Sequence, residues 1–150
     1  MKQEPGKRGG NVIIESDILV AHSKKSDWLK GVADPLFKKM EEGKTAMKTS
    51  SAALLELYYV LEDAGYGKEA ILAKQAELAS IRGLTIMPLT SEVILAAQSV
   101  MRTFRVPGLF DAIYAATALN QDDERKILST DEVYDRVAGI TRVDPRTYRP

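Results

Sequence analysis

Short runs of apolar and β-branched residues alternate along this chain with longer segments whose apolar residues recur every three or four positions. The short runs predict strands at residues 12–16, 45–49, 84–87, 126–129 and 139–143. The longer segments predict helices at residues 35–42, 51–64, 68–81, 91–104 and 111–119. Strands that alternate with helices indicate a mostly parallel sheet. We therefore expect an α/β three-layer sandwich, with four to five strands and helices on both faces.

Several predicted helix boundaries carry residues that are typical of such positions. Asp34 followed by Pro35 indicates a helix start, because proline is well tolerated at the first helical position. Ser50 or Ser51 is expected to cap the next helix, and Gly65 is expected to end it. The strand at residues 12–16 should bring Asp17 to its C-terminal end. Glu15 is expected to face away from Ser16, as an ion-pair partner.

The composition agrees with one domain. The chain has 150 residues and a mass of 16.5 kDa, which is enough for a full core. Residues 1–10 are polar and contain Gly and Pro, so we expect a disordered tail before a single domain at 11–150. No apolar run is long enough to span a membrane, which predicts a cytoplasmic protein. The formal net charge of zero provides no overall field to attract nucleic acid.

Four carboxylates interrupt segments that are otherwise apolar: Asp17, Glu56, Asp111 and Asp131. Burying an unpaired carboxylate costs several kcal/mol, so the four acids are expected to collect around a positive ion. The chain has no Cys and one His, which excludes thiolate sites and His clusters. Oxygen ligands remain, and they suit Mg²⁺ or Mn²⁺.

The segments that carry these acids resemble a PIN domain, the nuclease fold of VapC-type toxins and RNA-processing enzymes. The resemblance covers about residues 11–146 and rests on four pieces: Ile14-Glu15-Ser16-Asp17, Ser51-Ala52-Ala53-Leu54-Leu55-Glu56-Leu57, Leu109-Phe110-Asp111-Ala112-Ile113-Tyr114-Ala115-Ala116-Thr117-Ala118 and Leu128-Ser129-Thr130-Asp131-Glu132-Val133-Tyr134. It implies a ribonuclease that hydrolyses RNA phosphodiester bonds with Mg²⁺ or Mn²⁺. As a VapC-type toxin it would have an antitoxin protein as partner.

The resemblance also implies roles for single residues. Asp17, Asp111 and Asp131 would bind the metal directly or through water, and Glu56 would bind a second ion or hold a water. Ser129 would orient Asp131 or a metal-bound water.

Two cations close to the acids in the predicted fold are expected to contact substrate phosphates. Lys48 lies near the end of the second strand, and Arg105 lies in the loop before Asp111. One departure supports an alternative: family members follow the first acid with Thr or Ser and then Asn, whereas Ile18 and Leu19 follow Asp17. The alternative is a catalytically weak PIN module that binds RNA or a protein partner.

Other acidic-site α/β proteins fit less well. Dehalogenase-type phosphatases need an Asp-x-Asp pair after the first strand, where this chain has Glu15 and Asp17, and no Gly-rich phosphate loop is present. The apolar residues of the helices at 51–64 and 68–81 exceed what one sheet face covers. We therefore expect a homodimer or a higher homo-oligomer through residues that include Tyr58, Tyr59, Leu72 and Leu78.

Overall fold

The protein forms one sheet of five parallel strands in the order β3-β2-β1-β4-β5. In this computed structural model the described residues are 10, 12–121 and 124–150, so the tail predicted at 1–10 lies outside them, apart from Gly10. The strands are β1 (Ile13–Ile14), β2 (Met47–Ser50), β3 (Leu84–Met87), β4 (Lys126–Leu128) and β5 (Thr141–Val143). The predicted parallel α/β sandwich is confirmed.

β1 is the shortest strand and occupies the middle of the sheet. Ile13 pairs with Lys48 of β2 on one side and with Ile127 of β4 on the other. Ile13 and Ile14 are fully buried. A parallel sheet covered on both faces needs apolar side chains in both directions, which explains why β1 has no polar position.

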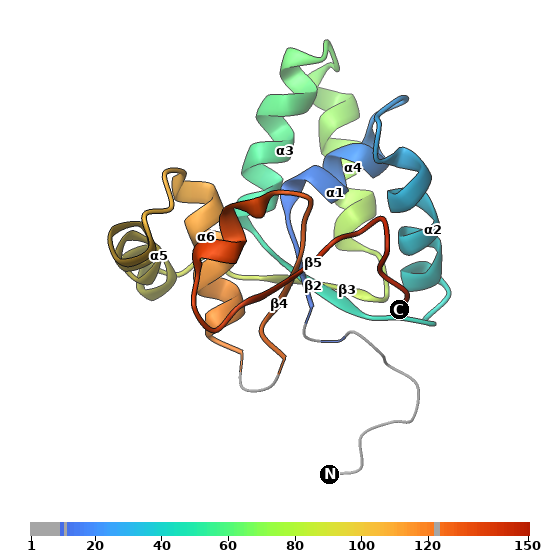
Figure 1. Cartoon of the computed structure of the whole chain (residues 1–150). Coiled ribbons are helices and arrows are strands. Elements are labelled where there is room, and N and C mark those ends of the chain that lie inside the picture. Colours follow the sequence, from blue (N-terminus) through green and yellow to red (C-terminus); the bar gives the residue numbers. More distant parts are fainter. Residues whose placement is uncertain (1–9, 11, 122–123) are drawn as a thin grey trace.

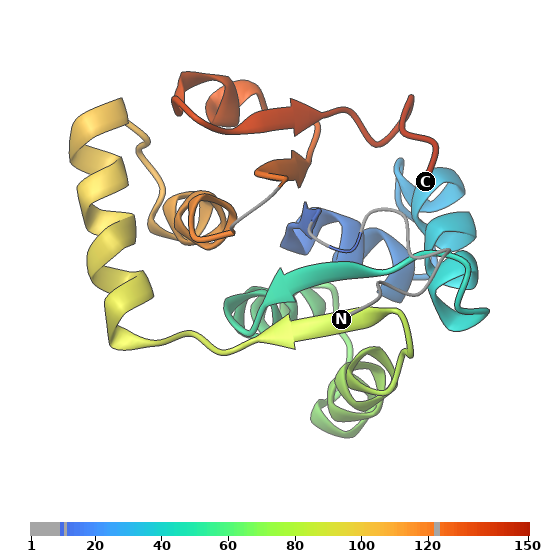
Figure 2. The same cartoon turned by 90° about the horizontal axis from the view of Figure 1, so that it is seen from below.

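Helices cover both faces of the sheet. They are α1 (Ser16–Ser23), α2 (Lys30–Glu41), α3 (Ala52–Asp63), α4 (Lys68–Ala79), α5 (Ser91–Phe104) and α6 (Leu109–Leu119), with a 3₁₀ helix η1 (Glu132–Arg136) before β5. Figure 1 shows α5 and α6 on one side of the strands and α1 to α4 gathered on the other. Figure 2 shows the same layers from below. Within the described residues, no helix is both long and apolar enough to cross a membrane.

The first strand is shorter than predicted, and it is followed by a helix that the sequence pattern did not reveal. Strand β1 ends at Ile14, and α1 begins at Ser16, so Asp17 lies in the first turn of α1 rather than at a strand end. Most residues of α1 are buried, including the consecutive residues 18–21. A helix that is buried on nearly all sides has no polar face, so it lacks the periodicity that identifies an amphipathic helix.

Helix α2 also differs from the prediction at its N-terminus. It begins at Lys30, and Pro35 lies inside it instead of at its first position. The chain turns into this helix where the Asp27 carboxylate accepts a hydrogen bond of 2.9 Å from the Leu29 N–H. Pro35 cannot donate to the Gly31 carbonyl, but both residues are exposed, so water can replace the missing hydrogen bond.

Gly83, directly before β3, provides a test of the packing. A Cβ atom at this position would collide with the Thr45 carbonyl oxygen and lie 2.7 Å from the Met40 carbonyl oxygen. We expect Gly83→Ala to lower the free energy of unfolding by about 1–3 kcal/mol, as overpacking does. Gly67→Ala is the control, because a Cβ there meets no atom within 4 Å. Urea denaturation measures the free energy of unfolding of both variants. If Gly83→Ala is as stable as Gly67→Ala, position 83 has room for a Cβ atom and the close packing is refuted.

Candidate functional site

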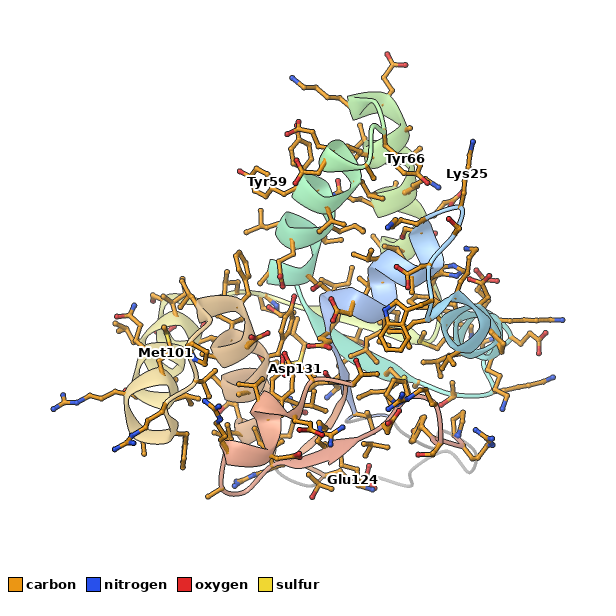
Figure 3. All side chains as sticks on the ribbon, turned by 45° about the horizontal axis from the view of Figure 1, so that its top comes forward. Lys25, Tyr59, Tyr66, Met101, Glu124 and Asp131 are labelled. Atoms are coloured by element: carbon orange, nitrogen blue, oxygen red, sulfur yellow. The ribbon has the colours of Figure 1, made fainter. Side chains whose placement is uncertain are left out.

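Five carboxylates approach the edge of the sheet where the strands end. Glu15 directly follows β1, Asp17 lies in the first turn of α1, Glu56 on α3, Asp111 in the first turn of α6, and Asp131 at the start of η1. Their charges act on one another, since the negative charges of neighbouring acids contribute to raising the pKa of four of them. Asp131, which is exposed, is labelled near the middle of the view in Figure 3.

Glu15 is the most buried of the five acids. It is 3% exposed, the Ser129 hydroxyl donates to its Oε1 at 2.5 Å, and the Tyr134 hydroxyl donates to its Oε2 at 2.8 Å. Burial raises the pKa of Glu15 to about 8, the charge of Asp17 adds to the shift, and the two hydroxyl donors oppose it. In the part of the chain that the structure describes, hydroxyl groups and not a cation therefore hold Glu15. The predicted ion-pair role was wrong because β1 ends at Ile14 and its alternation does not extend to Glu15.

Glu56 has a similar environment. The Tyr114 hydroxyl donates to Glu56 Oε1 at 2.5 Å, and a hydrogen bond with the Ser16 side chain adds to it. Burial raises the pKa of Glu56, and these hydrogen bonds partly offset the shift. Each of the two glutamates is thus bound by one serine and one tyrosine hydroxyl.

Asp111 and Asp131 are connected to Glu15 through the hydroxyl groups of Tyr134 and Ser129. The Tyr134 hydroxyl lies 3.4 Å from Asp111 Oδ1, and the pKa of Asp111 is raised by burial and then by the charge of Asp131. The Asp131 N–H donates to the Ser129 hydroxyl at 2.9 Å, and its carboxylate accepts from the Val133 N–H at 2.9 Å. Ser129 therefore connects the backbone of Asp131 to the carboxylate of Glu15.

Asp17 lies at the open side of the group. Its side chain is exposed, in contrast to that of Glu15. Partial loss of hydration raises the pKa of Asp17, a hydrogen bond with Glu15 opposes this, and the charge of Asp131 adds to it. Asp17 thus shares the electrostatics of the site while remaining accessible from solvent.

The two predicted phosphate-binding cations lie in different places. Lys48 lies within β2, and its ammonium group donates to the Gln121 side chain at 3.1 Å. Gln121 follows the C-terminal end of α6, ten residues from Asp111 and thus about 15 Å along the helix. Arg105 is exposed in the loop before α6, with a left-handed backbone (φ 56°) that ends α5. Arg105 thus precedes the helix that carries Asp111, whereas the Lys48 backbone pairs with Ile13, two residues before Glu15.

The donor set suits a hard divalent cation. Among the described residues, no three acidic side chains are already close enough together to hold an ion. The available donors are nevertheless carboxylate oxygens, which Mg²⁺ and Mn²⁺ prefer. Burial is the main cause of the raised pKa values of Glu15 and Asp111, and the negative charges of neighbouring acids add to it, so a cation would stabilise the charged carboxylates. The residues therefore fit such an ion chemically.

The sequence interpretation missed four residues of this site: Glu15, Ser16, Tyr114 and Tyr134. A signal for Glu15 was present, because an acid that directly follows a buried strand of a parallel sheet lies at the ligand-binding edge. The two tyrosines had no such signal. A tyrosine in an apolar segment is usually a core residue, and only the fold shows where its hydroxyl points.

Comparisons with known proteins agree with this fold. The family model described as PIN domain matches residues 12–140. The structure is similar to VapC20 from Mycobacterium tuberculosis, described as a sarcin-ricin loop cleaving toxin, at 18% identity and a TM-score of 0.64, covering 83% of this chain and 92% of that one. It is also similar to VapBC2 from Rickettsia felis, solved with a promoter DNA fragment, at 15% identity and a TM-score of 0.63, covering 89% and 98%. No curated protein matches the sequence.

The raised pKa of Glu15 predicts a pH dependence of stability. Folding favours the protonated carboxyl, so the free energy of unfolding of the metal-free protein should fall as pH rises from about 4.5 to about 8. Each unit of pKa shift corresponds to about 1.4 kcal/mol. Urea denaturation in EDTA across this range should show the decline, and Glu15→Gln should flatten it. Glu77→Gln, at an exposed position on α4, is the control. An equal slope in Glu15→Gln and wild type would rule out Glu15 as the source.

Proposed function

Because this chain belongs to the PIN domain family, we propose that it is a metal-dependent endoribonuclease that uses Mg²⁺ or Mn²⁺ to hydrolyse RNA. The observation that carries the proposal is the group of acids at the C-terminal edge of the sheet, with Glu15 buried at its centre. A structural ion-pair network would place cations beside these carboxylates. Hydroxyl groups are instead the partners of Glu15 and Glu56.

In this proposal Glu15, Asp111 and Asp131 hold the cation, and Glu56 and Asp17 take part directly or through water. A bound divalent cation would supply activation of water and neutralisation of the charge that develops on the phosphate. The side chains of the protein would orient these groups. Ser129 keeps the Glu15 carboxylate in place, since its hydroxyl donates to Oε1.

The position of Glu15 changes how the family pattern is applied. In that pattern the acid that ends the first strand is followed by Thr or Ser and then by Asn, a polar residue for which this chain would have Asp17. Glu15-Ser16-Asp17 fits this order, because β1 ends immediately before Glu15. Asp17 would then occupy the polar position, and Ile18 and Leu19 would belong to the buried part of α1. The main reason for expecting a catalytically weak module is thereby removed, and only an activity measurement decides between the two functions.

The similar structures support a more specific form of the proposal. One is described as a toxin that cleaves the sarcin-ricin loop, and the other as VapBC2 bound to a promoter fragment. We infer that this chain is the toxin of a toxin–antitoxin pair, with RNA as substrate and an antitoxin protein as partner. Arg105, exposed in the loop before α6, is proposed to contact a substrate phosphate. The same role stays a prediction for Lys48.

The proposal predicts opposite effects of neutralising single acids with and without metal. Asp17→Asn, Asp111→Asn and Asp131→Asn should each leave the melting temperature in EDTA unchanged or raised, because one repelling charge is removed. Each should also abolish the stabilisation by Mn²⁺, which for wild type at 100 times the dissociation constant is about 2.7 kcal/mol. RNA cleavage should be lost in parallel. Differential scanning fluorimetry and cleavage of a labelled RNA measure the two effects.

The control for these variants is Asp63→Asn, at the exposed C-terminal end of α3. If the three site variants lose stability in EDTA and Mn²⁺ never shifts the wild-type melting temperature, the acids are structural and the nuclease proposal fails. If wild type binds Mn²⁺ and RNA without cleaving the RNA, the binding module is the correct function.

Self-association is proposed through α3 and α4. Tyr59 and Leu72 are 63% and 67% exposed, and Leu55, one turn before Tyr59, is 52% exposed. Leu78, expected in the same interface, is a core residue instead, at 2% exposed. Large apolar side chains exposed on neighbouring helices are typical of an interaction surface, and a symmetric dimer is the commonest oligomer.

We expect a dimer at micromolar concentration in sedimentation experiments. The double variant Tyr59→Ser/Leu72→Ser should be mainly monomeric, because it removes apolar area that a partner would cover. Leu95→Ser, an equally exposed position on α5, is the control and should leave the dimer intact. A wild-type protein that sediments only as a monomer would refute the proposed interface.

A further inference from the structure

Tyr134 is a fully buried tyrosine whose hydroxyl lies between two of the acids. Its side chain is 0% exposed, and its hydroxyl is 2.8 Å from Glu15 Oε2 and 3.4 Å from Asp111 Oδ1. Glu15 follows the central strand, and Asp111 begins a helix on one face of the sheet. A single hydroxyl group therefore contacts carboxylates that come from two separate layers of the fold.

We propose that Tyr134 is a positioning residue whose hydroxyl holds the carboxylates of Glu15 and Asp111 at the spacing that a divalent cation requires. The proposal rests on the metal-dependent function proposed above. It adds a determinant of metal affinity that is not an acid and to which the sequence interpretation gave no role.

The Glu15 carboxylate has enough lone pairs to accept from its hydroxyl donors and to bind a metal ion as well. Each carboxylate oxygen can accept about two hydrogen bonds or ligand contacts. The Ser129 hydroxyl uses one position on Oε1, and the Tyr134 hydroxyl uses one on Oε2. Each oxygen therefore retains a lone pair, and the two hydroxyls restrict the orientation of the carboxylate. A carboxylate that is already oriented loses less freedom when it binds an ion.

The position of Tyr134 is itself constrained from both ends of η1. The Asp131 carboxylate accepts from the Val133 N–H at 2.9 Å at the start of this helix. The Arg136 guanidinium donates to the Arg105 carbonyl oxygen at 2.9 Å at its end. The second contact links η1 to the loop that leads into α6. These contacts fix the short helix that carries Tyr134 and tie it to the loop before α6, whose first turn carries Asp111.

Tyr134→Phe removes the hydroxyl and keeps the ring. We expect the affinity for Mn²⁺, measured by isothermal titration calorimetry without RNA, to fall about 10–100-fold, as it does when a residue that orients a metal ligand is lost. Tyr66→Phe is the matched control, because the Tyr66 hydroxyl accepts from the Lys25 N–H far from the acids. That variant should bind Mn²⁺ as wild type does.

A double-mutant cycle separates positioning from a general effect on packing. If Tyr134 acts through Glu15, adding Tyr134→Phe to Glu15→Gln should weaken Mn²⁺ binding by clearly less than it does in wild type. An undiminished loss in the Glu15→Gln background would show that the tyrosine acts only on the fold, and this would overturn the proposal. Unchanged or tighter Mn²⁺ binding by Tyr134→Phe alone would also overturn it. If wild type itself binds no Mn²⁺, the proposed function fails first.

If Tyr134→Phe does not fold, the wild-type protein provides the test. The chain has six tyrosines, which can be labelled as 3-fluorotyrosine and observed by ¹⁹F NMR. A titration with paramagnetic Mn²⁺ identifies the resonance of Tyr134 by its proximity to the ion. Addition of Mg²⁺ should then shift the Tyr134 resonance and leave the Tyr66 resonance in place. A Tyr134 resonance that does not respond to Mg²⁺ would overturn the proposal.

Discussion

The burial of the Glu15 carboxylate is the constraint on which the site depends. A carboxyl group at 3% exposure needs hydrogen-bond donors, because losing its hydration without replacement costs several kcal/mol. The donors come from Ser129, directly after β4, and from Tyr134 in η1. The same interaction therefore satisfies the acid and attaches the segment after β4 to the end of β1. Segments that are 114 and 119 residues apart are joined at one point.

The strand order explains why this point is a ligand site. The chain places β2 on one side of β1 and β4 on the other, so the direction of strand addition reverses at β1. In open α/β sheets such a reversal leaves a crevice beyond the C-terminal ends of the strands, because the connections leave toward opposite faces. Glu15 follows one of the two central strands, and Ser129 and Asp131 follow the other. The topology alone would place a ligand between them.

Protons and a metal ion are alternative ways to stabilise these acids. In the metal-free protein, burial and then the charges of neighbouring acids raise the pKa values of Glu15 and Asp111, so protonation stabilises these groups. A divalent cation would take over this function and displace protons when it binds, since metal ligands must be deprotonated. Metal affinity is thus expected to rise with pH, whereas the stability of the metal-free protein is expected to fall. The tyrosine and serine hydroxyls would serve both states, since they can donate to a carboxylate while it binds an ion.

The sequence by itself determined the fold class, the strands beyond the first, and four of the five acids that approach the edge of the sheet. These features depend on local periodicity and on the cost of placing charge in apolar segments, and both can be recognised without coordinates. The sequence did not reveal that β1 ends at Ile14, because the all-round burial of α1 removes its periodicity. That boundary decides that Glu15, and not Asp17, is the acid at the strand end. Only the tertiary structure could show the tyrosine hydroxyls on Glu15 and Glu56, since the direction of a buried polar group depends on residues distant in sequence.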